Sequence, residues 1–316
     1  MLFSIIIPIL NRANYLPRLF ASLSQIDAEG VEVLLVDNGS IDNSLHLCRD
    51  FQREQLLKGL SVQVLSQEKP SASSARNLGA SAAKGQYLYF FDSDDEFDPH
   101  FLHDAQPLIG TADLLSAPTL MIFPDGSTKK RAMPRGHLLL GHLLAGSFST
   151  QSYLIKRDFW ENFGGWNENL RQWDDWELGV RLLLHHPVVN WLPATAYHRI
   201  YQHKESQTGA PLGQVLPFYQ KALLEVEEQL LRSGRHKSER HALLSAVKAK
   251  ALLLCGIAHR QGEKELANSL SEATLKWFSN PLIKGLFRSI YQYDRCGGRG
   301  TWRIYYLLCR LFLSVK

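Results

Sequence analysis

The sequence predicts an α/β fold, with a mixed, mostly parallel sheet flanked by helices and followed by a helical C-terminal region. Two observations support this. In the first 91 residues, short runs of β-branched and aromatic residues alternate with stretches of helical periodicity. Beyond residue 212 the pattern is helical throughout, with breaks near Gly234 and between Asn280 and Pro281. Strands that alternate with helices form right-handed βαβ units and therefore mostly parallel sheets.

The expected elements follow in chain order. In the first part, strands are expected at residues 3–7, 31–36, 61–65 and 87–91, and helices at 15–25, 41–55 and 74–83. Residues 98–151 have a mixed pattern, in which we expect a strand at 118–124, a hairpin turn at Asp125-Gly126 and a short helix at 136–146. Further strands are expected at 153–155, 188–191 and 196–201, and further helices at 157–163 and 172–185.

The composition is that of an ordinary folded protein. The 316 residues are 45% hydrophobic and 21% charged, and the formal net charge is +4. Residues 271–316 contain eight Lys and Arg against two acidic residues, so the basic excess belongs to the tail and the rest of the chain is slightly acidic. No nucleic-acid partner is expected.

The cysteines and the N-terminus indicate a cytoplasmic protein. The four cysteines form no CxxC pair, which argues against a zinc site or a disulfide framework and favours a reducing compartment. Residues 1–8 lack a basic region and break at Pro8, so we expect a strand there and not a signal peptide. No run reaches the ~18 uninterrupted apolar residues of a membrane span.

An acidic cluster follows the fourth expected strand. The apolar run Tyr87–Phe91 gives way at once to Asp92-Ser93-Asp94-Asp95-Glu96. Ligands of open α/β sheets bind at the carboxyl ends of strands, and Asp92 and Asp94 can reach one hard cation. Such oxygen ligands suit Mg²⁺ or Mn²⁺, which complete their shells with water and substrate phosphates. The alternative is a polar loop with capping acids.

Two polar residues near other strand ends are candidates for ligand contact. Asp37 could accept a hydrogen bond from a base imide or a ribose hydroxyl, or it could bond its own backbone in a turn. Arg76 lies at the start of an expected helix, where a cation is unfavourable. It therefore suggests an anionic partner such as a pyrophosphate, and a solvated surface arginine is the alternative.

A second acidic focus is Trp173-Asp174-Asp175-Trp176. Carboxylates at a helix start can act as caps. However, the two tryptophans provide a low dielectric that would raise the pKa of a carboxylate, as a general base for a hydroxyl requires. Aromatic faces also suit sugar rings.

Glycine-rich phosphate loops are missing. A dinucleotide-binding domain needs G-x-G-x-x-G after the first strand, where Pro8-Ile9-Leu10-Asn11-Arg12 stands instead, and no Walker A sequence occurs. We therefore expect phosphates to be held through a metal ion.

Five motifs, in this order, resemble those of family 2 glycosyltransferases, which are inverting, metal-dependent enzymes with a Rossmann-like GT-A fold. The motifs are Ser4–Pro8, Val36–Ser40, Ala75–Gly79, Phe91–Asp95 and Trp173–Trp176. The resemblance covers roughly residues 1–209. It implies a nucleotide-sugar-binding half at 1–98, an acceptor-binding half at 99–210 and a helical region at 211–316.

The resemblance also implies roles for the residues around the nucleotide and the metal. The residues that would hold the nucleotide are Pro8, Asn11, Asp37 and Arg76. Asp92 and Asp94 would form the DxD motif, with Asp94 the firmer metal ligand and Asp92 facing the ribose or the metal. Asn38 departs from the family's usual second aspartate and puts base specificity in doubt.

For catalysis, the resemblance implies that Asp175 is the base that deprotonates the acceptor, with Asp174 beside it in place of the usual glutamate. An aromatic-Arg stretch and a His followed by Ser match residues 197–206. Within it, His203 best fits the position near the metal or diphosphate. His198 is a competing candidate, and a structural histidine is the alternative for both.

The implied function is transfer of a sugar from a nucleotide-sugar, with a UDP-sugar favoured, to a hydroxyl of a glycan or lipid-linked acceptor in cell-surface polysaccharide synthesis. A sugar-phosphate nucleotidyltransferase would need a basic, glycine-rich loop after the first strand, which is missing. A catalytically weak nucleotide- or glycan-binding protein is the other alternative, and the presence of Asp92, Asp94 and Asp175 argues against it.

The C-terminal segment Trp302–Leu313 is apolar on most faces, with basic and aromatic residues interspersed. Helices of this kind can lie on an anionic membrane surface. That would make the protein peripheral on the inner face of the membrane. The alternative is a helix packed against protein, and the sequence does not separate the two.

Overall fold

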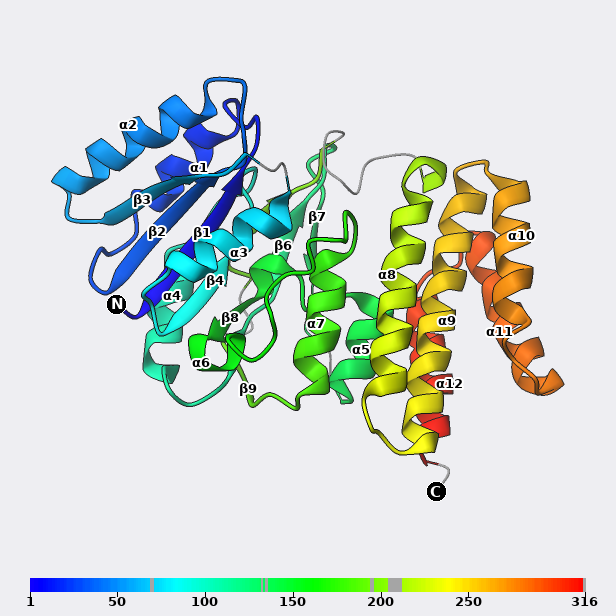
Figure 1. Ribbon diagram of the computed structural model, residues 1–316. Helices are drawn as coiled ribbons and strands as arrows, with labels where there is room; N and C mark the ends of the chain where they lie inside the picture. The colour runs from blue at the N-terminus through cyan, green and yellow to red at the C-terminus, as the bar shows by residue number, and fades with distance from the viewer. Residues whose placement is uncertain (69–70, 132, 134–135, 194–195, 204–211, 315–316) are drawn as a thin grey trace. The chain divides into compact units, whose positions relative to one another are not determined.

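The computed structural model describes the chain except residues 69–70, 132, 134–135, 194–195, 204–211 and 315–316 (Figure 1). The chain divides into two compact units. The first comprises residues 1–133, 148–178 and 185–203, and the second comprises residues 134–147, 179–184 and 204–316. The three-part division expected from the sequence stays a prediction, and its boundary at residues 210–211 lies outside the described residues.

The first unit is built on a seven-stranded sheet in the order β3-β2-β1-β4-β8-β5-β9. Neighbouring strands are parallel, except that β8 runs antiparallel to β4 and β5. The strands are β1 (Phe3–Ile9), β2 (Val31–Asp37), β3 (Ser61–Ser66), β4 (Tyr87–Phe90), β5 (Leu114–Ser116), β8 (Tyr153–Lys156) and β9 (Val189–Trp191). The predicted fold class is confirmed, whereas β5 was not predicted.

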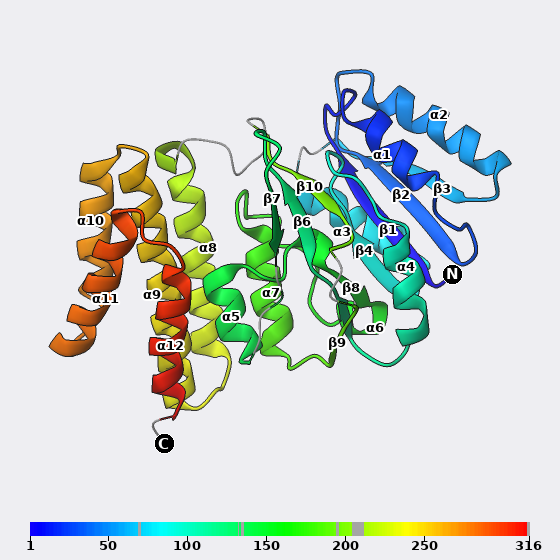
Figure 2. The same cartoon turned by 180° about the vertical axis from the view of Figure 1, so that it is seen from behind.

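Helices cover both faces of the parallel part of this sheet (Figures 1 and 2). These helices are α1 (Leu16–Leu23), α2 (Ser44–Leu57), α3 (Ala72–Ala82) and α4 (His100–Ala105). Alternate residues of β1 and β2, among them Ile5 and Val33, pack in one core with Leu19 of α1, Phe51 of α2 and Phe101 of α4. Every residue of β1, β2 and β4 is buried, as expected for strands covered on both faces.

The helix α3 lies close to the other face of the sheet. A β-carbon added at Gly79 would lie 2.4 Å from Cγ2 of Ile6 and 3.2 Å from Cγ2 of Val36. Glycine therefore permits the close approach that brings the first turn of α3, with Arg76, to the carboxyl ends of β1 and β4. On the same face, Phe90 packs against Trp166 with ring centroids 5.2 Å apart.

A second, three-stranded sheet completes the first unit, in the order β10-β6-β7. Its strands are β6 (Thr119–Ile122), β7 (Thr128–Arg131) and β10 (Arg199–Tyr201). The hairpin predicted at Asp125-Gly126 joins β6 to β7, and Gly126 has a φ of 78°.

Two element predictions in this unit are wrong in detail. The first strand continues beyond Pro8 to Ile9. The helix expected at 157–163 is only α6 (Arg157–Trp160), because the chain turns toward Gly164 and Gly165, both at positive φ. Other short segments are η1 (Gln106–Leu108) and η2 (Thr150–Ser152), while α7 (Asp174–Leu184) is close to the predicted 172–185.

The second unit is helical, as predicted. It contains α5 (Leu138–Ala145), α8 (Leu212–Arg232), α9 (Lys237–Arg260), α10 (Lys264–Leu275), α11 (Pro281–Arg295) and α12 (Thr301–Ser314). The breaks near Gly234 and before Pro281 are confirmed. Two others were missed, at Gly262 and between Gly297 and Gly300, all three at positive φ.

The helix α9 is the centre of the second unit, and α5, α8, α10, α11 and α12 pack on it. Among the described residues, α9 is the helix that is long and apolar enough to cross a membrane, which the search for uninterrupted apolar runs did not find. However, 61% of its apolar window is buried within the protein, as is usual for a core helix.

One face of α12 packs against protein. Tyr305 and Cys309 are buried, and the Tyr305 hydroxyl donates a hydrogen bond to the Phe287 carbonyl at 3.2 Å. The interpretation of this helix as a packed element is therefore correct for that face. Ile304, Leu307 and Leu311 remain exposed, and membrane contact stays a prediction.

Candidate functional site

Arg76 joins the two acidic motifs predicted from the sequence. Its Nη2 donates to Asp92 Oδ1 at 2.7 Å, and its Nη1 donates to Asp174 Oδ2 at 3.0 Å. The guanidinium is buried and lies 4.4 Å from the centroid of the Trp166 ring. The expected anionic partner of Arg76 thus includes two carboxylates of this chain. Direct contact between Arg76 and a nucleotide stays a prediction.

A second donor on Asp92 comes from Gln151. Its Nε2 lies 2.8 Å from Asp92 Oδ2 and 2.7 Å from Asp95 Oδ2. Asp95 also accepts a hydrogen bond from the backbone N–H of Tyr201 at 2.7 Å. Burial raises the pKa of Asp92, with Arg76 opposing the rise, and burial together with the charges of Asp94 and Asp92 raises the pKa of Asp95 well above its usual value. Both oxygens of Asp92 are therefore already engaged by protein donors.

Asp94 has a different environment. Its Oδ2 lies 2.9 Å from Nε2 of His203 and 3.7 Å from Nη2 of Arg12. The His203 ring stacks on Tyr15 at a centroid distance of 5.0 Å. Arg18 donates to the Asp94 carbonyl and lies 3.7 Å from the centroid of the Tyr201 ring. Of the two candidate histidines, His203 is thus the one beside the DxD motif.

The donor chemistry of this pair fits a divalent cation. Among the described residues, no group of three or more His, Cys, Asp or Glu side chains is arranged to hold a metal. A site formed by Asp94 and His203 would consequently take its remaining ligands from water and substrate phosphates, which is the usual arrangement for Mg²⁺. Metal ligation by Asp92, Asp94 and His203 stays a prediction.

His198 occupies an aromatic core. It is 1% exposed, and its ring centroid lies 4.7 Å from that of Phe101 and 5.0 Å from that of Phe97. Its Nδ1 accepts a hydrogen bond from the Asp98 backbone at 3.1 Å. Burial lowers the pKa of His198 to about 3, so the ring is neutral. This environment is that of a structural histidine.

One carboxylate oxygen of Asp37 accepts hydrogen bonds, and the other has no hydrogen-bond partner among the described residues. Oδ2 accepts from the backbone N–H groups of Gly39 and Ser40, both at 3.3 Å. Oδ1 is buried and has no hydrogen-bond partner among the described residues. The turn interpretation of Asp37 is therefore confirmed. Because Oδ1 is left over, the same side chain can still accept a hydrogen bond from a ligand.

Asn11 and Asn38 shape the loops around Asp37. Asn11, at a positive φ of 52°, accepts from the Ile41 backbone at 2.9 Å. Asn38 accepts from Gln67 at 2.6 Å and from the Ser71 backbone at 3.1 Å, so it connects the end of β2 to the segment before α3. Pro8 is buried within β1. Contact of Pro8 and Asn11 with a nucleotide stays a prediction.

Asp174 and Asp175 begin α7, and the two carboxylates have different hydrogen-bond partners. Asp174 Oδ2 accepts from Ser73 Oγ and from Arg76, both at 3.0 Å. Asp175 accepts from the backbone N–H of Trp176 at 2.7 Å. Burial, and then the charge of Asp174, raises the pKa of Asp175 to about 6. Its pKa therefore suits a general base near neutral pH.

The backbone before this pair is unusual. Trp173 has a φ of 57°, in the left-handed region that non-glycine residues seldom adopt. Such conformations cost about 1–3 kcal/mol and concentrate at functional sites. The ring of Trp173 lies 5.0 Å from that of Trp176, as expected for a low-dielectric surround. Asn11 also has a positive φ, but asparagine tolerates this region better than tryptophan does.

Sequence reasoning missed Gln151 and Arg18. Gln151 lies in η2, within a region without a readable pattern, and the Tyr89 hydroxyl donates to its carbonyl at 2.9 Å. Arg18 lies in an ordinary amphipathic helix. No sequence signal distinguishes either residue, because only the tertiary fold brings them to the acidic loop.

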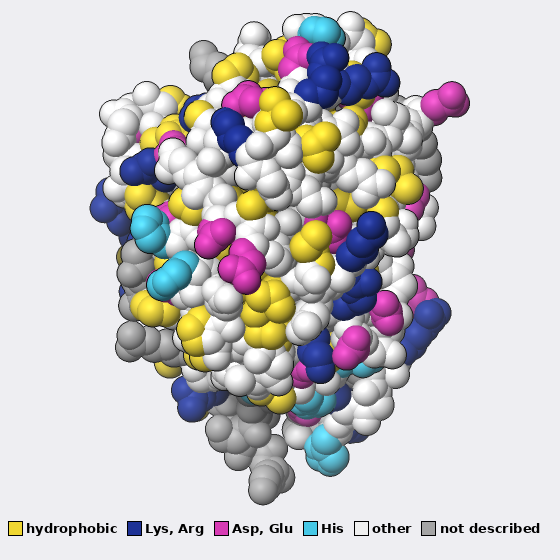
Figure 3. Space-filling view, turned by 90° about the vertical axis from the view of Figure 1, so that its left-hand side faces the viewer, with side chains coloured by type: hydrophobic (Ala, Val, Ile, Leu, Met, Phe, Trp, Pro, Cys, Tyr) yellow, Lys and Arg dark blue, Asp and Glu magenta, His cyan; other side chains and the backbone are white. Residues whose placement is uncertain are grey.

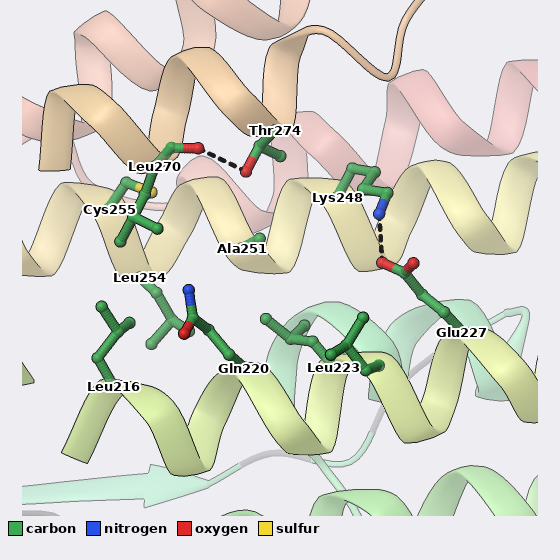
Figure 4. Close-up of a pocket in the computed structure, with 11 residues that line it drawn as sticks. Leu216, Gln220, Leu223, Glu227, Lys248, Ala251, Leu254, Cys255, Leu270 and Thr274 are labelled. Atoms are coloured by element: carbon green, nitrogen blue, oxygen red, sulfur yellow. Dashed lines mark hydrogen bonds and ion pairs between the residues drawn. The ribbon is translucent and has the colours of Figure 1, made fainter. Parts of the chain in front are cut away.

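Two other parts of the described surface can be compared with this site. On the face drawn in Figure 3, acidic, basic and hydrophobic side chains are intermixed. The second unit has a hollow of about 350 Å³ between α8, α9 and α10 (Figure 4). Its lining is mostly aliphatic, and the Lys248–Glu227 ion pair neutralises its charge. That hollow has no carboxylate pair to activate a hydroxyl.

The fold and the strand-end carboxylates define an α/β protein of the GT-A class. Solved structures with this fold include Staphylococcus aureus TarS residues 1–349 in complex with UDP-GlcNAc, with a TM-score of 0.64 and 18% identity over 98% of this chain and 92% of that one. Another is the mannosyltransferase PcManGT from Pyrobaculum calidifontis in complex with GDP-Man and Mn²⁺, with a TM-score of 0.59 and 16% identity over 98% of this chain and 86% of that one. The glycosyl transferase family 2 model matches residues 4–170, and the chain belongs to that family.

Curated relatives match over shorter segments. Glycosyltransferase GlyG of Streptococcus pneumoniae serotype 4 is 39% identical over 95 residues, which are 30% of this chain and 30% of that protein. The minor teichoic acid biosynthesis protein GgaA of Bacillus subtilis is 30% identical over 130 residues, 40% of this chain and 28% of that protein. The chain thus spans about a third of the length of the curated relatives it matches.

Proposed function

We propose that this protein is a metal-dependent, inverting glycosyltransferase of hexosyltransferase type. It moves a sugar from a nucleotide-sugar to a hydroxyl group of a glycan or lipid-linked acceptor. The observation that supports the proposal is that hydrogen bonds through Arg76 join the two acidic motifs. Asp94, which contacts His203, lies in the same acidic loop as Asp92, and Asp92 is joined through Arg76 to Asp174, beside Asp175.

For the donor, we favour a UDP-sugar. Oδ1 of Asp37 has no hydrogen-bond partner among the described residues and lies at the end of β2, which supports its proposed role as acceptor for a base imide or a ribose hydroxyl. Pro8, Asn11 and Arg76 complete the proposed nucleotide contacts. UDP-GlcNAc is bound in the TarS structure and GDP-Man with Mn²⁺ in PcManGT, which supports a nucleotide-sugar donor in this fold.

The proposed cation, Mn²⁺ or Mg²⁺, would be held by Asp94 and His203. Asp92 is less suited because Arg76 and Gln151 occupy its oxygens. When bound, such a cation neutralises charge that develops on the diphosphate leaving group. The stacking of His203 on Tyr15 and the hydrogen bond from Arg18 to the Asp94 carbonyl orient the two ligands.

Asp175 is the proposed base. Above its pKa of about 6 it is ionised and can accept the proton of the acceptor hydroxyl. The hydroxyl oxygen then attacks the anomeric carbon opposite the leaving diphosphate, so that one displacement inverts the configuration. Asp174 is engaged by Ser73 and Arg76, which fix the first turn of α7 and thereby the position of Asp175.

The proposed cellular setting is cell-surface polysaccharide synthesis in the cytoplasm, with the protein peripheral on the inner face of the membrane. The name of the relative GgaA supports the pathway class. The basic tail and the exposed Ile304, Leu307 and Leu311 of α12 support contact with an anionic lipid surface.

Calorimetric titration with UDP and GDP, in Mn²⁺ and then in EDTA, tests the donor site. We expect one nucleotide to bind in Mn²⁺ and to lose at least about tenfold in affinity with EDTA or in His203→Gln. His100→Gln is the matched control, because His100 is an exposed histidine paired with Asp98 outside the site. Binding that is unaffected by EDTA and by His203→Gln would refute the proposed cation site.

A further inference from the structure

Two basic side chains on the edge strand of the second sheet are not accounted for by the proposed reaction. β7 forms the edge of the β10-β6-β7 sheet (Figure 2). Lys129 is exposed and Arg131 is half-buried, and neither side chain has a hydrogen-bond or ion-pair partner among the described residues. By contrast, Arg12, Arg76 and Arg199 each pair with a carboxylate.

Strand register relates β7 to the site. Tyr201 pairs with Ile122, which pairs with Thr128, so the start of β7 is level with the end of β10. Two strand spacings separate β10 from β7, a distance of about 10 Å. His203, beside Asp94, follows β10 by two residues. The edge strand therefore runs alongside the proposed site.

Alternation along β7 divides its side chains between the two faces of the sheet. Lys130 is in register with Leu120 and Arg199, on the face where Arg199 and Tyr201 contact Glu96. Lys129 and Arg131 consequently lie on the opposite face.

On this face, Arg131 is the residue whose charge acts on the proposed base. The register partner of Arg131 is Thr119, whose buried hydroxyl has no hydrogen-bond partner among the described residues. The charges that act on Asp175 are those of Asp174, Arg131 and Arg76, and Arg131 lowers the pKa of Asp175. Arg131 is thus near enough to Asp175 to influence its ionisation.

We propose that the acceptor carries a phosphate group close to its reacting hydroxyl and that Lys129 and Arg131 bind this phosphate. This inference rests on the proposed function and names its acceptor class. Residues two apart on a strand are separated by about 7 Å, so the two side chains can converge on one phosphate or contact two successive ones. Arg and Lys are the side chains that recognise phosphate, through paired hydrogen bonds and point charge.

Binding of acceptor probes to the full-length protein, with UDP and Mn²⁺ saturating the donor site, tests this proposal. The probes are a glycerol-phosphate oligomer and an uncharged glycerol oligomer with the same number of hydroxyl groups. A prenyl-diphosphate-linked hexose in detergent micelles distinguishes a lipid-borne phosphate from a polymer-borne one.

We expect the phosphate-bearing probe to bind more tightly than its uncharged counterpart. K129Q and R131Q should each weaken its binding by about two- to fivefold, the range for solvated ion pairs. The double variant should bind the phosphate-bearing probe about tenfold more weakly, and 0.5 M NaCl should also weaken this binding. K130Q, a charge removed from the opposite face of the same strand, is the matched control and should leave binding within about twofold.

Turnover supplies an independent readout, measured above pH 8 so that Asp175 is ionised in every variant. K129Q should raise the KM for the phosphate-bearing acceptor and leave kcat unchanged. Equal binding of both oligomers, or equal losses in K129Q and K130Q, would overturn the proposal and would assign the basic residues to protection of a sheet edge. UDP binding that persists in that case would leave the proposed function standing, whereas loss of Mn²⁺-dependent UDP binding in the unmodified protein would refute the function itself.

Discussion

Asp174→Asn tests how the network controls the proposed base. Both hydrogen bonds to Asp174 end on Oδ2, and the amide oxygen of asparagine can accept them in the same place. The substitution therefore removes a charge beside Asp175 while it retains the contacts of Ser73 and Arg76. Asp174 is the second-largest cause of the raised pKa of Asp175, after burial.

The expected effect follows from the sign of that interaction. A base is active when ionised, so kcat/KM of the unmodified protein should fall about tenfold per pH unit below a pKa of about 6. Without the negative charge of Asp174, Asp175 ionises more easily, and the acid limb should move down by about one pH unit. At pH 5 the variant should be several-fold more active relative to its own plateau.

The assay is the pH dependence of kcat/KM, measured by release of the nucleoside diphosphate. Ser73→Ala, which removes one hydrogen bond to Asp174 without a change of charge, is the control and should leave the position of the acid limb unchanged. Asp175→Asn should retain donor binding and lower the rate by about 10²–10⁴. An acid limb that stays in place in Asp174→Asn, together with transfer by Asp175→Asn, would refute the assignment of the base.

Three further predictions concern stability and the acidic loop. The folded-state pKa of His198 is about 3, so below pH ~6.5 the unfolded chain binds a proton that the folded protein does not. The free energy of unfolding should therefore fall by about 1.4 kcal/mol per pH unit below that value. In His198→Gln, calorimetry should show that the free energy of unfolding depends less steeply on pH. Gly79→Ala should destabilise by about 1–3 kcal/mol in urea titrations because its β-carbon would overlap Ile6, whereas Gly285→Ala, exposed in α11 with open space around it, should stabilise by up to about 1 kcal/mol. Gln151→Leu should weaken Mn²⁺-dependent UDP binding by about tenfold in calorimetry, since Asp92 and Asp95 lose a shared donor; unchanged binding would mean that Gln151 does not organise the loop.

The fold was predictable from the sequence where periodicity and burial agree. The strands β1, β2 and β4 are mostly apolar and buried throughout because both of their faces are covered. The element β5 has three residues and α4 has six, too few for a periodic pattern to emerge. A helix break such as that at Gly262 depends on one residue with a positive φ, and a single glycine in the sequence does not predict such a φ.

The carboxylates of the site were predictable from the sequence, but their hydrogen-bond partners were not. Asp92, Asp94, Asp174 and Asp175 follow strand ends or begin a helix, and local patterns identify such places. That Arg76 joins the two motifs depends on the approach of α3 to the sheet. Pairings across 98 residues, such as Arg76 with Asp174, leave no trace in local sequence.

Which face of α12 is exposed was likewise not predictable from the sequence. The amphipathic pattern of α12 was evident in the sequence, but which residues pack inward depends on the neighbouring α9 and α11. Burial of Tyr305 and Cys309 uses one face of the helix, and the exposed residues of the other face are those that remain for a lipid surface.

The most direct test of the central claim is the affinity for UDP and UDP-sugars, measured by calorimetry in Mn²⁺ for the unmodified protein, Asp94→Asn and Asp175→Asn. We predict that the unmodified protein and Asp175→Asn bind with similar affinity and that Asp94→Asn loses most of its binding. Equal affinity in all three proteins, or no Mn²⁺-dependent binding of UDP or GDP in any of them, would contradict a nucleotide-sugar site built on Asp94 and His203.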